Sequence, residues 1–182
     1  MFNTLNIEEK RLIVQLPYRV GLYVSESDQT GGDESDEQEA QVLASIIQGF
    51  AEDVMGAESI QHIISTTLML KEQWGEWTAD LDAVPRECEK AVGIMAQHVS
   101  PKDAKAFSTQ MYEIGEAVAL AFKEYEEGNL IKDLMTRFRY WQDQVYHKRH
   151  GLREKTYDEY ISISADERAA LKKLAIGLQL AS

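Results

Sequence analysis

The residues that could do chemistry are concentrated first in the acidic segment 26–39. This segment carries seven carboxylates, among them Asp28, Asp33, Asp36 and Glu39, and contains no basic residue. Hard divalent cations such as calcium and magnesium bind carboxylate and carbonyl oxygens on a flexible frame. The segment is therefore a candidate divalent-cation site, and the alternative is a solvated acidic connection between two helices.

The spacing of these carboxylates invites comparison with the calcium-binding loop of the EF-hand. Asp28 and Glu39 would occupy its first and last ligand positions, but Asp33 stands where that loop requires glycine. The segment is therefore not an EF-hand, and a site here would be a looser set of oxygen ligands.

A second acidic helix start resembles the first. Asp158 precedes Glu167 as Asp28 precedes Glu39, and we align Glu39 with Glu167. The alignment pairs apolar positions and one glycine of the two following helices: Leu43 with Leu171, Ile46 with Leu174, and Gly49 with Gly177. The sequence therefore predicts a weak internal two-fold repeat, and Asp158 and Glu167 join the candidate metal ligands.

Helices must position these acidic starts, because apolar residues recur at helical spacing along most of the chain. Only residues 157–163 have strand-like composition, and one isolated strand cannot build a sheet. Pro17 should kink the first helix or divide it into two pieces. We predict a single compact all-α domain over 1–182, of about seven helices, at residues 7–25, 36–55, 59–77, 85–99, 100–122, 130–145 and 164–178.

Several helix ends carry specific start signals. Ser35, Ser100 and Ser164 each precede an acidic first turn, as residues that cap the free N–H groups of a helix do. Trp74 and Trp77, near the end of the third helix, are interpreted as packing anchors rather than ligand-stacking residues.

These motifs give the chain a resemblance to a known family. Val-Ser-Glu-Ser-Asp at 24–28, followed by Ser-Asp-Glu-Gln-Glu at 35–39, and Tyr-Ile-Ser-Ile-Ser-Ala-Asp-Glu-Arg at 160–168 are similar to two segments of the TerB-like tellurite-resistance family. In that family each segment reads Asp-Gly-x-x-Ser-x-x-Glu and opens a helix. The glycine is absent after both Asp28 and Asp158 here, and 123–155 looks like an insertion. The resemblance implies an all-α fold with an acidic cation-binding surface in a stress-response assembly.

Bulk composition restricts the partners. The 182 residues carry a formal charge of −12, which disfavours nucleic acid and anionic membranes because phosphate contacts need a positive surface. A protein partner or a second copy of the chain is the expected partner. Cys88 is the only cysteine, and neither a signal peptide nor a membrane-spanning run is evident. We therefore expect a cytoplasmic protein without membrane insertion.

No other constellation points to catalysis. His62, His98, His147 and His150 lack the partners of a zinc or di-iron site, and no phosphate-binding glycine loop or nucleophile elbow is present. The basic aromatic segment 132–155 is interpreted as an amphipathic helix. We expect a non-catalytic helical module that binds calcium or magnesium. A ligand-free interaction domain is the alternative, and a metal-dependent enzyme is the second alternative.

Overall fold

The computed structural model describes residues 4–27, 36–52, 57–122 and 165–180. Within these ranges the chain is helical and contains no strand, which confirms the all-α prediction. Two short 3-10 helices connect the longer ones. The elements are α1 (Ile7–Ser25), α2 (Asp36–Ala51), α3 (Glu58–Met69), η2 (Lys71–Trp77), η3 (Leu81–Ala83), α4 (Val84–His98), α5 (Pro101–Phe122) and α8 (Ala165–Gly177).

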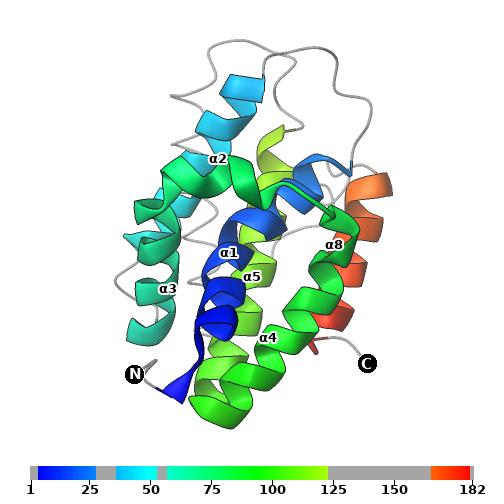
Figure 1. Ribbon diagram of the computed structural model, residues 1–182. Coiled ribbons are helices and arrows are strands. Elements are labelled where there is room, and N and C mark those ends of the chain that lie inside the picture. The colour runs from blue at the N-terminus through cyan, green and yellow to red at the C-terminus, as the bar shows by residue number, and fades with distance from the viewer. Residues whose placement is uncertain (1–3, 28–35, 53–56, 123–164, 181–182) are drawn as a thin grey trace.

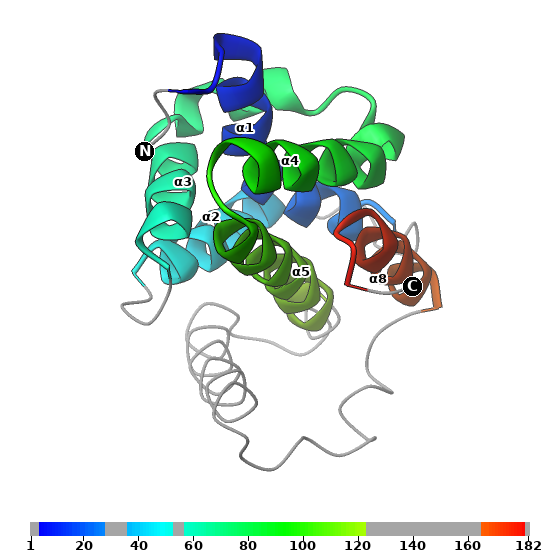
Figure 2. The same ribbon diagram turned by 90° about the horizontal axis from the view of Figure 1, so that it is seen from below.

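Helices α1 and α5 form the centre of the bundle. They pack against each other, with α2 and α3 on one side and α4 and α8 on the other (Figures 1 and 2). The buried side chains form one cluster, and its largest fully buried members include Leu16, Phe107, Met111 and Ile114. A continuous core of this kind is what the helical stripes of the sequence predict.

Helix α1 begins with a complete capping box. Asn6 Oδ1 accepts a hydrogen bond from the Glu9 N–H, and Glu9 Oε2 accepts one from the Asn6 N–H, both at 2.9 Å. Pro17 does not divide the helix, which is continuous from Ile7 to Ser25. Of the two predicted outcomes, division into two pieces was wrong, because the helix continues through the buried Pro17, whereas a kink there stays a prediction.

The predicted helix 59–77 is instead two elements. α3 ends at Met69, and the chain tightens into the 3-10 helix η2. Trp74 explains the change, because its Nε1–H donates to the carbonyl oxygen of Thr67 at 3.0 Å and satisfies one terminal acceptor of α3. The Trp74 ring stacks on Tyr18 at a centroid distance of 4.4 Å, and Trp77 meets Tyr18 edge-on at 6.2 Å. Both tryptophans are buried, so the prediction of packing anchors is confirmed.

The start of α5 carries the predicted serine cap. Ser100 Oγ accepts from the Asp103 N–H at 3.0 Å, and the Ser100 and Ser59 hydroxyl groups both donate to the Asp103 carboxylate. The hydrogen bonds from Ser100 and then Ser59 lower the pKa of Asp103. This carboxylate therefore joins the first turns of α3 and α5.

Helices α2 and α8 present matched leucines to the central pair. Leu43 and Leu171 are 2% and 5% exposed, so their predicted burial is confirmed. Leu43 of α2 contacts α1 at Gly21. Leu171 and Leu174 of α8 contact α5 at Gly115. These two contacts support the two-fold repeat, which stays a prediction.

Candidate functional site

The predicted metal ligands divide into three groups: three residues outside the described part of the chain, two in α2 and one in α8. Asp28, Asp33 and Asp158 lie outside the described residues. Asp36 and Glu39 occupy the first turn of α2, as predicted.

Glu167 lies in the first turn of α8 and is 2% exposed, whereas its neighbour Asp166 is exposed. Among the residues that the structure describes, no three His, Cys, Asp or Glu side chains are arranged to hold a metal ion.

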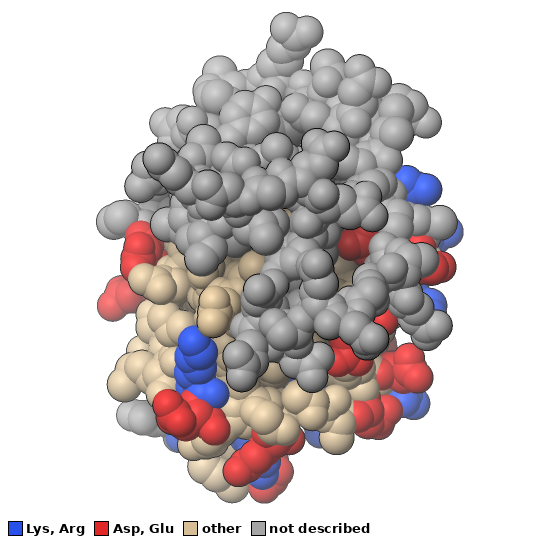
Figure 3. All heavy atoms as spheres, turned by 90° about the horizontal axis from the view of Figure 1, so that it is seen from above, with Lys and Arg blue, Asp and Glu red and all other residues tan. Residues whose placement is uncertain are grey.

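The two acidic helix starts lie at the same end of the bundle. α1 ends there with Glu26 and Ser27, and α2 and α8 begin there (Figure 1). Seen from this end, the described surface shows Asp and Glu side chains beside fewer Lys and Arg side chains (Figure 3). The topology therefore places both acidic helix starts at one end of the bundle, with α2 on one side of the central pair and α8 on the other.

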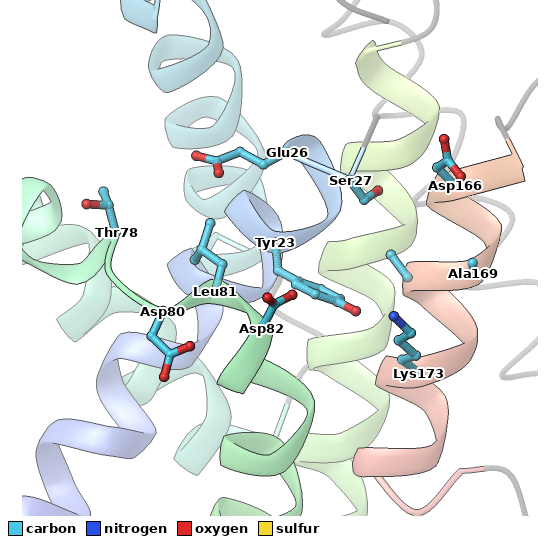
Figure 4. A pocket seen from close by; sticks show the side chains of 11 residues that line it. Tyr23, Glu26, Ser27, Thr78, Asp80, Leu81, Asp82, Asp166, Ala169 and Lys173 are labelled. Carbon is cyan, nitrogen blue, oxygen red and sulfur yellow. The ribbon is translucent and has the colours of Figure 1, made fainter. Parts of the chain in front are cut away.

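An open groove of about 720 Å³ lies at this end, between the end of α1, residues 78–82 and the first turns of α8. Its lining includes the acidic residues Glu26, Asp80, Asp82 and Asp166, with Lys173 as the basic residue (Figure 4). A groove of this size is in the range of small-molecule sites.

One wall of the groove is fixed by a buried arginine. Arg19 is 6% exposed, and its Nη1 donates to the carbonyl oxygens of Trp77 at 2.5 Å and Ala79 at 2.8 Å. Its Nη2 donates to the carbonyl oxygen of Asp80 at 3.1 Å, and its Nε forms an ion pair with Glu87 at 2.9 Å. Buried charges need such partners, and here the partners are the backbone of the loop that lines the groove.

The same loop contains an unusual backbone conformation. Asp80 has φ 49° and ψ 58°, in the left-handed region that residues other than glycine rarely adopt. Aspartate is among the residues that tolerate this conformation, and the bond from Arg19 to its carbonyl group supports it. The chain then turns into η3, which carries Asp82 into the groove.

Tyr23 forms the inner part of the groove. Its side chain is 8% exposed, and its ring points from α1 toward α8 with Asp82 beside it (Figure 4). Burial, followed by the charges of Asp82 and Cys88, raises the pKa of Tyr23. The hydroxyl group is therefore neutral and able to donate or accept a hydrogen bond at physiological pH.

Other residues with reactive chemistry do not form a second site in the described part of the chain. Cys88 is completely buried, and burial raises the pKa of its thiol, which disfavours a nucleophilic role. His62 and His98 belong to no metal-binding group there. His147, His150 and the basic segment 132–155 lie outside the described residues.

Sequence reasoning missed Arg19, Tyr23 and Asp82. Arg19 lies three residues after Leu16 and seven after Leu12, on the apolar face of α1, and a charge in that register was the signal that could have revealed it.

Comparison with family models, with curated proteins and with solved structures gave no match. No described helix is long and apolar enough to cross a membrane.

Proposed function

We propose that this chain is a non-catalytic helical module that binds a divalent cation at its acidic helix starts. The observation that carries the proposal is topological: the end of α1 and the beginnings of α2 and α8 share one end of the bundle. Asp36 and Glu39 thereby lie at the end that Asp166 also occupies.

Repulsion between carboxylates would make the stability of the module depend on the bound cation. Carboxylates close together repel, by ~1 kcal/mol for two charges ~4 Å apart in water and by more near a low-dielectric surface. A bound calcium or magnesium ion would relieve that repulsion and favour the folded state. The resemblance to the TerB-like family favours a role in a stress-response assembly, with a protein partner or a second copy of the chain.

A melting experiment tests the proposal. At a hundredfold excess over its dissociation constant, a cation adds ~2.7 kcal/mol of stability, and each kcal/mol shifts Tm by ~2–4 °C in a domain of this size. The expected rise between chelator and calcium is roughly 5–10 °C, beyond that of sodium chloride at equal ionic strength. Magnesium, manganese and zinc in the same experiment identify the preferred ion.

The variant D28N/E39Q should lose the calcium-specific rise. E8Q/E89Q is the matched control, because it removes two carboxylates from α1 and α4 outside the acidic segment. A melting curve that responds to calcium no more than to sodium chloride would leave the alternative, a ligand-free interaction domain.

A further inference from the structure

Tyr23 carries a hydroxyl group for which the described part of the chain supplies no hydrogen-bond partner. Its side chain is more than nine-tenths buried, yet its hydroxyl makes no hydrogen bond with another described residue. The hydroxyl points into the groove, toward the side where Lys173 approaches from α8 (Figure 4). Buried polar groups are normally hydrogen-bonded, and an unmet one costs stability. A ligand in the groove would supply the missing partner.

The charge of the groove indicates the charge that its ligand carries. Among the described lining residues, four carboxylates and one ammonium group give a formal charge of −3. Asp82 comes from the loop held by Arg19, and Asp166 comes from the first turn of α8. Carboxylates on opposite walls favour a ligand with positive charge at more than one point.

The spacing of the carboxylates argues against a single metal ion in this groove. No three of the described acidic side chains converge as metal ligands do. The rest of the described lining is mixed: the Tyr23 ring, Leu81, Ala169 and Ala170 add apolar surface among polar side chains. Separate charges with apolar patches beside them match a chain of methylene groups that carries ammonium groups at intervals.

We propose that this groove binds a linear aliphatic polyamine. Its ammonium groups donate hydrogen bonds to the carboxylates of Asp82 and Asp166 and to the hydroxyl oxygen of Tyr23. Its methylene segments lie on Leu81 and the exposed methyl group of Ala169. The volume of about 720 Å³ suits a small molecule of this kind, and the proposed contacts use neither Asp28 nor Glu39 of the cation site.

The ammonium group of Lys173 competes with the ligand for the space beside the Tyr23 hydroxyl. Its side chain extends from α8 toward the Tyr23 hydroxyl (Figure 4), and it makes no ion pair in the described part of the chain. Its ammonium group has the charge and the donors of the ligand, so it repels a polyamine that approaches Tyr23. Removing that charge should therefore strengthen binding, which simple loss of folding cannot do.

Calorimetric titration with spermidine at constant ionic strength tests the proposal. Y23F removes only the hydroxyl, a neutral acceptor for the ammonium group, and should weaken binding roughly threefold or more. D82N should weaken it about tenfold, since charged hydrogen bonds are stronger. K173Q should strengthen binding by a few-fold, roughly as expected for one neighbouring charge.

Matched controls lie next to these residues. K172Q and E89Q change exposed charges that do not line the groove and should leave spermidine affinity unchanged. Circular dichroism of every variant confirms folding. The proposal is overturned if spermidine binds no better than magnesium at equal charge, if Y23F, D82N and K173Q behave like the controls, or if only a trilysine peptide binds. D28N/E39Q should keep its spermidine affinity, so failure of this site and of the calcium site are distinguishable.

Discussion

The guanidinium of Arg19 and the carboxylate of Glu87 form an ion pair that joins α1 to α4, with Nε and Oε2 2.9 Å apart. The Arg19 side chain is 7% exposed and that of Glu87 is 28% exposed. Three of the remaining guanidinium hydrogens bind backbone carbonyl groups of residues 77–80. One side chain therefore links two helices and a wall of the groove.

Replacing this arginine should be costly. R19M leaves Glu87 without its partner and frees three loop carbonyl groups. We expect a loss of roughly 3 kcal/mol in the free energy of unfolding, at the lower end for broken buried pairs because Glu87 is partly solvated. Urea denaturation measures it, with R86M, on an exposed arginine of α4, as the control. Equal stability of the two variants would show that the Arg19 contacts contribute nothing.

Two glycines of the bundle should respond to alanine in opposite directions. In α8, a methyl group at Gly177 would overlap the carbonyl group of Pro85, which is backbone and cannot rotate away. G177A should therefore cost ~1–3 kcal/mol, as overpacked sites do. Gly93 in α4 has no atom within 4 Å of the added methyl group, so G93A should gain ~0.5–1 kcal/mol. Thermal denaturation should give a Tm below that of the unmodified protein for G177A and above it for G93A.

The matched leucines should contribute comparably to stability. L43A and L171A each empty a buried site, and each should lower the free energy of unfolding by ~2–5 kcal/mol. I176A removes an apolar side chain that is 57% exposed and should cost far less. Denaturant midpoints that barely move in both leucine variants would contradict the two-fold repeat.

The lowered pKa of Asp103 predicts that the free energy of unfolding decreases as the pH falls below the ordinary range of a carboxyl group. Because the folded-state pKa lies below the ordinary value of 3.8, this carboxylate stabilises the fold above that pH. The contribution is lost as the pH falls through the folded-state pKa. In S59A/S100A both donors are gone, so the pKa measured by NMR should rise. The stability of D103N should also fall less steeply with acid than that of the unmodified protein, and E89Q should not reproduce this difference.

Cys88 should be chemically silent in the folded protein. Its side chain is completely buried, and burial raises the pKa of its thiol, so the thiolate that attacks disulfide reagents is scarce. Labelling by a thiol reagent should follow the population of opened molecules, accelerating with urea. Rapid labelling without denaturant would contradict this burial.

Most helix positions were accessible from the sequence because they depend on local rules. The cap at Ser100 and the apolar stripes are short-range patterns. The break of α3 at Met69 was not accessible, because the tertiary contact of Trp74 with Tyr18 favours the tighter 3-10 turn.

The candidate groove was less accessible, since its parts come from separate regions of the chain. Tyr23 belongs to α1, Asp82 to η3 and Lys173 to α8. Nothing in the local sequence of any one of them indicates the other two. The acidic segment 26–39 was visible at once because all its carboxylates are neighbours in sequence, and of its described residues Glu26 and Ser27 line the groove.

The position of α8 has a consequence for synthesis in the cell. Leu174 of α8 covers Gly115 of α5, and Gly177 lies against Pro85 of α4. Until α8 has left the ribosome, the nascent chain exposes these apolar surfaces of α4 and α5. Long-range contacts of this kind close late and leave aggregation-prone surface in the meantime. Docking of α8 therefore ends the exposure of these surfaces of α4 and α5 during synthesis.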